Sequence, residues 1–190
     1  MRFGVSLPNV GDCGNPHTLV ELAREAEQAG RAGVFVWDCI HIEIAERDRL
    51  PMADPWIATD SMTFLPQPVQ SPRIPIWLDA VWPRMRSMRR AIQYDGIMPS
   101  KKNDDGTNGP MTPEDIRVMK AWIEEQRPAM SSFDILREGE TSGDNQEEAG
   151  GIIQPFRESG VTWWIESVWT HFYRGTLESM RTRIRQGPPL

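Results

Sequence analysis

Short apolar segments and helical patterns alternate along most of the chain, and this repeat is the feature that most restricts its fold. Six segments have the composition of β-strands, and most of them precede a stretch with apolar residues at helical spacing. The expected strands begin near residues 3, 34, 74, 97, 133 and 161. A repeated strand–helix unit predicts a parallel sheet whose helices pack outside it.

The first unit shows this pattern most clearly. Residues 3–8 are apolar and end at a Pro-Asn pair, as a strand does before a loop. Asn15 followed by Pro16 predicts a helix start, because an asparagine side chain caps a helix and proline suits its first position. Gly30 predicts the end of that helix. Residues 34–37 are apolar without alternation, which is typical of a strand covered on both faces.

The later units are equally regular, whereas residues 41–72 are not. Thr112, followed by a proline and by Asp115, predicts another capped helix start. Further helices are expected at residues 147–158 and 176–186. Residues 41–72 contain five prolines and no sustained period, so they are either a functional excursion or the trace of a deletion.

Length and composition fit one domain, residues 1–190. A complete (β/α)8 barrel usually takes about 250 residues, and this chain has 190. With 39% hydrophobic residues and a formal net charge of −6, we expect a soluble, cytoplasmic protein that binds no nucleic acid. No apolar run reaches the roughly 20 residues of a membrane span, and no signal-peptide pattern precedes the first strand.

Cysteine and tryptophan each narrow the possibilities further. Cys13 and Cys39 do not form a metal-binding pattern, so two free thiols are expected. Eight tryptophans, several of them clustered, indicate a broad aromatic surface. That surface is either core and subunit interface or a pocket for a flat ligand.

Several segments, in a fixed order along the chain, carry a likeness to a known family. They are residues 3–8, 33–38, 54–56, 68–77, 88–91 and 95–99, together with the tryptophan-rich last strand and the closing Gly-Pro-Pro. Together they resemble the bacterial luciferase-like monooxygenases, a family of flavin- and deazaflavin-dependent oxidoreductases. The resemblance implies a TIM-barrel-like fold with a flavin-type cofactor.

The resemblance also implies that part of the barrel is missing. In the family, the segment like residues 54–56 begins the second helix, and the segment like residues 68–77 leads into the fifth strand. Here the two are joined directly near residues 58–63. We therefore expect a truncated TIM-barrel-like fold of about six parallel strands that lacks the third and fourth βα units. The strands beside the gap either pair and close a tighter barrel or remain edges, which a partner subunit would cover in a homodimer.

In a parallel barrel, catalytic side chains lie at the C-terminal ends of the strands. That rule selects Asn9, residues 38–41, Asp79, Ser100, Arg137 with Glu138, and Glu166 with Ser167. Among these, Asp38 and His41 are candidates for an acid/base pair, since histidine titrates near neutrality. The alternative is that Asp38 caps a loop and His41 is a surface residue. Glu166 resembles the family's flavin-facing acid and completes the catalytic candidates.

The cofactor-binding candidates are aromatic and polar residues near the strand ends. Trp77 and Trp164 are expected to line or stack on an isoalloxazine ring, although alternation allows only one of Trp163 and Trp164 to face the barrel. The further candidates are Asn9, Asp79, Arg174 and Gly175, of which the last two precede the final helix and suit a phosphate.

Three smaller features bear on the chemistry of the site. Cys39 is a candidate reactive thiol, and it follows Asp38 where relatives often have histidine. His41 with Glu43 has no third ligand nearby, so no metal is expected. Relatives often have glycine after the fifth strand, where this chain has Asp79.

The sequence therefore predicts an oxidoreductase or monooxygenase that acts on a small organic substrate. Its cofactor is FMN or a deazaflavin of the coenzyme F-420 type. The alternative is a non-catalytic remnant of the family that binds a flavin-like ligand or acts as an interaction partner.

Overall fold

The computed structural model describes residues 1–36, 74–127, 132–168, 171 and 174–189. The chain divides into two units, one of Met1–Trp37 with Pro75–Leu190 and one of Asp38–Ile74. Only Ile74 of the second unit is described. The account below concerns the first unit.

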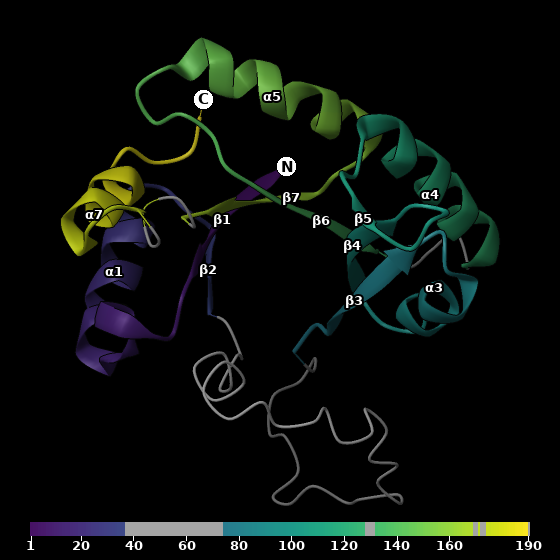
Figure 1. The fold of residues 1–190 in the computed structure, drawn as a ribbon, viewed down its shortest axis with the longest axis horizontal. Coiled ribbons are helices and arrows are strands. Elements are labelled where there is room, and N and C mark those ends of the chain that lie inside the picture. Colours follow the sequence, from purple (N-terminus) through teal and green to yellow (C-terminus); the bar gives the residue numbers. More distant parts are fainter. Residues whose placement is uncertain (37–73, 128–131, 169–170, 172–173, 190) are drawn as a thin grey trace, which may run out of the picture. The chain divides into compact units, whose positions relative to one another are not determined.

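A sheet of mostly parallel strands forms the centre of this unit (Figure 1). Its strand order is β2-β1-β7-β6-β4-β3, and β5 pairs antiparallel with β4. The strands are β1 (Arg2–Leu7), β2 (Gly33–Val36), β3 (Trp77–Trp82), β4 (Gly96–Lys102), β5 (Asn108–Gly109), β6 (Asp134–Gly139) and β7 (Trp163–Ser167). The prediction of a parallel sheet from alternating strands and helices is confirmed. The third strand begins at Trp77 rather than near Ile74, and the amide of Ile76 bonds instead to the Asp95 side chain at 2.6 Å.

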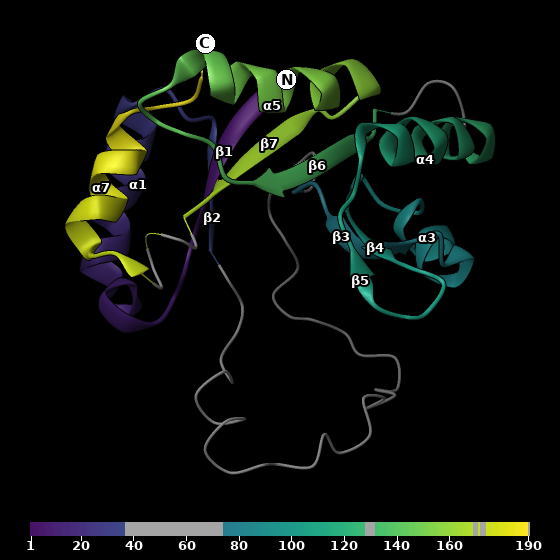
Figure 2. The same cartoon turned by 45° about the horizontal axis from the view of Figure 1, so that its top comes forward.

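Helices follow the strands at the predicted positions. They are α1 (Pro16–Gln28), α3 (Met85–Ala91), α4 (Pro113–Gln126), α5 (Gln146–Ser159) and α7 (Leu177–Arg185), with a short 3-10 helix, η1 (Gly11–Gly14), after β1. Asn15 caps α1 through the amide of His17, and Thr112 forms the predicted capping box with Asp115. Helix α1 packs against α7 and α4 against α5, as Figures 1 and 2 show from two directions.

Two apolar clusters join the sheet to these helices. On β1, Val5 and Leu7 pack against Leu22 of α1 and Ile184 of α7. The second cluster lies between β3, β4, β6 and the helices α3 and α4, and its buried members include Ala80, Ile97, Ile135, Met88, Ile116 and Met119. Side chains alternate along a strand, so the residues between these positions lie on the opposite face. We call that opposite face the inner face of the sheet.

An aromatic cluster occupies the inner face. Phe35 of β2 stacks on Trp77 of β3 with ring centroids 5.9 Å apart, and Trp77 lies 5.4 Å from Trp163 of β7. Leu136 and Ile165 belong to the same buried cluster. Because β2 and β3 are the two ends of the strand order, the sheet curves until side chains of its end strands meet. In the described strands β2 pairs only with β1, so a tighter barrel closed by β2–β3 hydrogen bonds is not formed there.

A helix that crosses a bilayer needs about 20 mostly apolar residues. Across the residues that the structure describes, no helix is long and apolar enough to cross a bilayer.

Candidate functional site

A cavity of about 530 Å³ lies at the C-terminal ends of β3, β4 and β6. Ligands of parallel sheets bind at this end of the strands, so the cavity is in the expected place. Its lining residues are Asp79, Met98, Pro99, Ser100, Lys101, Asn108, Gly109, Pro110, Met111, Arg137 and Glu138. We call it the strand-end cavity.

The strand register explains which of these side chains share a face. Asp79 of β3 lies beside Met98 of β4, and Gly96 lies beside Asp134 of β6. Every second side chain of a strand lies on the same face. Ser100, two residues after Met98, and Glu138, four residues after Asp134, therefore lie on the inner face. Asp79, Ser100 and Glu138, three candidates of the strand-end rule, therefore line the cavity from the inner face. Arg137, a fourth candidate, also lines the cavity although its guanidinium points to α5.

The two cations of the strand-end cavity are already engaged. The Lys101 ammonium donates to both Asp115 carboxylate oxygens at 2.8 Å. Arg137 donates to the backbone carbonyl of Glu138, and its guanidinium lies 5.4 Å from the centre of the Phe156 ring. Burial lowers the pKa of Arg137, and the nearby Glu138 carboxylate opposes that shift. The Nε atom of Arg137 is buried without a hydrogen-bond partner.

Trp164 and Glu166 do not lie with Trp77 and Asp79. Trp164 and Glu166 point to the helix side of β7, whereas Trp163 is on the inner face. The prediction that Trp163 and Trp164 face opposite sides of the sheet is therefore confirmed. Glu166 is 1% exposed. Its oxygens accept hydrogen bonds from the Thr141 amide at 2.7 Å, the Thr141 hydroxyl at 2.8 Å and the Trp164 indole at 3.2 Å. This carboxylate therefore faces away from the strand-end cavity.

Two buried arginines complete the surroundings of Glu166. Arg183 of α7 forms an ion pair with it at 3.2 Å. Arg31 and Arg183 both donate to the carbonyl of Gly187, at 2.9 Å and 3.1 Å. Burial, with the charge of Arg183, lowers the pKa of Arg31 to about 10. The cluster fastens the segment after α7 to the sheet, which is a structural task.

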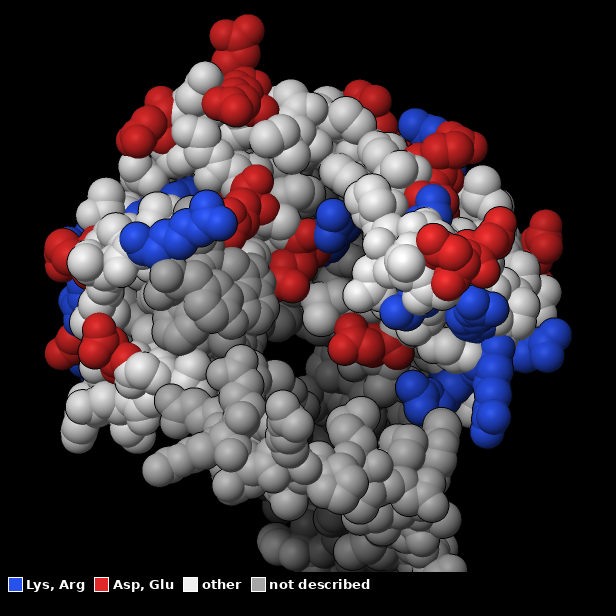
Figure 3. All heavy atoms as spheres, viewed as in Figure 1, with Lys and Arg blue, Asp and Glu red and all other residues white. Residues whose placement is uncertain are grey.

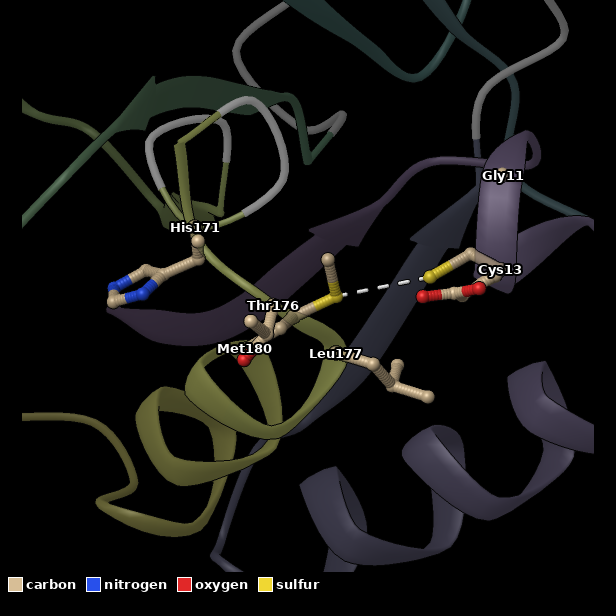
Figure 4. A pocket seen from close by; sticks show the side chains of 8 residues that line it. Gly11, Cys13, His171, Thr176, Leu177 and Met180 are labelled. Atoms are coloured by element: carbon tan, nitrogen blue, oxygen red, sulfur yellow. Dashed lines mark hydrogen bonds between the residues drawn. The ribbon is translucent and has the colours of Figure 1, made fainter.

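A smaller pocket of about 250 Å³ lies between η1 and the start of α7 (Figure 4). Gly175 lines it, and the Cys13 thiol contacts the Met180 sulfur there at 3.7 Å. Burial, together with Asp12, raises the pKa of Cys13. His171 lies on the side of the pocket away from Cys13 in Figure 4.

The smaller pocket offers little to the phosphate that the sequence places there. The Asp12 carboxylate lines it, while Arg174 is exposed and not part of the lining. The amide of Ser179 is already bonded to the Thr176 side chain in the α7 capping box. Asn9 follows β1, and its Oδ1 is buried without a hydrogen-bond partner.

Comparisons with protein-family models, curated proteins and solved structures find no match for this chain. The site is therefore interpreted from its own residues.

The predicted acid/base pair, Asp38 and His41, lies outside the described residues, as do Cys39 and Glu43. Within the part of the chain that is described, no three histidine, cysteine, aspartate or glutamate side chains are grouped to hold a metal ion.

Charges of both signs share the surface of the unit (Figure 3). Basic side chains gather at the lower right of that view, where Figure 1 places α3. The exposed arginines of this region are Arg84, Arg86, Arg89 and Arg90.

Proposed function

We propose that this chain is a luciferase-like oxidoreductase that holds FMN or a deazaflavin against the inner face of its sheet. One observation carries the proposal: the indole N–H groups of Trp77 and Trp163 are both buried and have no hydrogen-bond partner. An unsatisfied buried donor costs about 1–3 kcal/mol, which a ligand acceptor would offset. The edge of a flavin ring carries carbonyl oxygens and ring nitrogens that accept such bonds.

The surroundings of the two indoles support a ring ligand. Phe35, Trp77 and Trp163 supply aromatic surface, and Asp79 follows Trp77 on the same face. Neither indole lines the strand-end cavity. At about 530 Å³, the cavity is within the usual range of roughly 300–1,000 Å³ for small-molecule sites. The bound cofactor would supply hydride or oxygen chemistry, and the protein would position a small organic substrate and exclude water.

The proposal extends to the fold and the assembly. We assign β3 the place of the family's fifth strand, so that the third and fourth βα units are absent; the contact between Phe35 and Trp77 across the end strands supports this assignment. The same reasoning favours a homodimer that covers the strand edges. Light scattering is expected to give twice the chain mass of 21.7 kDa, and a monomeric mass at micromolar concentration would contradict the dimer.

Titration of FMN and of the deazaflavin, followed by fluorescence, tests cofactor binding. Trp77→Phe and Trp163→Phe keep one aromatic ring and remove the N–H together with the five-membered ring of the indole. Loss of one net hydrogen bond alone is expected to weaken binding about threefold to tenfold. Trp122→Phe, on the helix side at α4, is the matched control and is expected to bind as the parent does.

Two results would contradict the cofactor proposal. Absence of binding by either cofactor at high micromolar concentration would remove the oxidoreductase function. Binding that both phenylalanine variants leave unchanged would remove the position assigned to the ring.

One observation favours the alternative, a non-catalytic remnant. Glu166, the acid that the resemblance places beside the flavin, is held in a buried ion pair on the helix side. A remnant would bind a cofactor without consuming an added reductant, whereas turnover with any reductant would exclude it.

A further inference from the structure

We propose that the strand-end cavity binds a small polar ligand through the hydrogen-bond donors of that ligand, hydroxyl or ammonium groups, which Glu138, Ser100 and Asn108 accept. The inference rests on the proposed function for one point, that this ligand is the substrate. Binding itself is argued from the cavity alone.

Glu138 provides the main recognition group. It is partly buried at the end of β6, and among the described residues its carboxylate has neither an ion pair nor a hydrogen bond. The Arg137 guanidinium acts on this carboxylate through its charge. A partly desolvated carboxylate that accepts no hydrogen bond binds donors favourably, and a charged acceptor makes bonds roughly twice as strong as a neutral one.

Ser100 and Asn108 add exposed acceptors to the lining of the cavity. Neither side chain forms a hydrogen bond with another described residue. The backbone of Asn108 is held because β5 pairs Lys102 with Asn108. The turn before it is tied by the bond from Asn103 to Thr107 at 3.0 Å. The backbone of both residues is therefore held in the sheet, and only their exposed side chains have to be ordered when a ligand arrives.

The cations of the cavity do not make it an anion site. The charge of Lys101 is neutralised by both oxygens of Asp115 at 2.8 Å. Arg137 is turned toward the Glu138 carbonyl and the Phe156 ring. Met98, Pro99 and Met111 leave an apolar wall for the carbon skeleton of the ligand. The Glu138 carboxylate is therefore left to accept hydrogen bonds from donor groups of a ligand.

Calorimetric titration with three probes tests the ligand class: butylamine for ammonium, sorbitol for hydroxyl groups, and benzene as an apolar comparator. We expect butylamine or sorbitol to bind at millimolar concentration and benzene not to bind. Glu138→Gln removes the charge and keeps an acceptor oxygen. We therefore expect it to weaken the binding of the charged butylamine about tenfold and that of the neutral sorbitol about threefold. Glu147→Gln, an exposed site in the first turn of α5, is the matched control.

Three outcomes would overturn the inference. The first is binding of benzene that Glu138→Leu strengthens. The second is the absence of heat from both butylamine and sorbitol at millimolar concentration, and the third is probe binding that Glu138→Gln leaves unchanged. Circular dichroism of each variant checks that it is folded. The titrations are run without flavin, so probe binding in a protein that fails to bind FMN would contradict the proposed function and leave this inference standing.

Discussion

Replacing Glu166 with leucine is expected to destabilise the protein by about 3–5 kcal/mol, the usual cost of breaking a buried ion pair from one side. The substitution leaves the buried Arg183, which is 3% exposed, without the carboxylate that neutralises its charge. Arg31, which is 5% exposed, lies beside it. The donors of Thr141 and Trp164 lose their acceptor as well. Urea denaturation would show the loss as a lower midpoint with an unchanged slope.

Two further variants separate the effect of charge from that of shape and compare a buried ion pair with an exposed one. Glu166→Gln keeps one acceptor oxygen and removes the charge. Its free energy of unfolding is therefore expected to lie between those of the parent and of the leucine variant. Glu21→Gln removes an ion pair with Arg181 whose glutamate side chain is 58% exposed, and it is expected to cost less than about 1 kcal/mol. A leucine variant as stable as Glu21→Gln would show that the Glu166 cluster contributes little to folding.

This prediction also bears on how Glu166 is interpreted functionally. Loss of activity in a Glu166 variant would resemble loss of a catalytic acid, although the carboxylate faces the helices. Stability must therefore be measured before any rate is attributed to this residue.

The sequence predicts the strands and helices well because their signals are local. Asn15 and Thr112 cap α1 and α4 as their patterns indicate. The strand-end rule also selects Asp79, Ser100 and Glu138, which line one cavity, because parallel strands bring their C-terminal ends to the same edge. Asn108 is missed, since a strand of two residues has no pattern to detect.

The sequence does not predict which way Glu166 points. All five residues of β7 are buried, so no polar alternation distinguishes its faces. The partners that decide the matter, Thr141 and Arg183, are distant in sequence and meet Glu166 only in the folded sheet. Trp163 rather than Trp164 lies beside Trp77 for the same reason.

Gly96→Ala is expected to destabilise the protein by about 1–3 kcal/mol, the cost of overpacking a core. Gly96 lies beside Trp77 in the β3–β4 register. A Cβ atom there would be 2.5 Å from the Trp77 ring and 2.7 Å from the Asp134 carbonyl. Movement of the indole relieves only the first contact, so the backbone of β4 or β6 has to shift as well. Thermal or urea unfolding would record the loss.

The matched control is Gly150→Ala in α5, where a Cβ atom would meet nothing within 4 Å. Alanine is the better helix former by roughly 1 kcal/mol, so this variant is expected to be more stable than the parent. If both glycine variants gain stability, the space beside Trp77 is not tightly filled. If only Gly96→Ala loses it and also loses flavin affinity, the two effects have one cause, because the indole that joins the end strands is the one proposed to contact the ring.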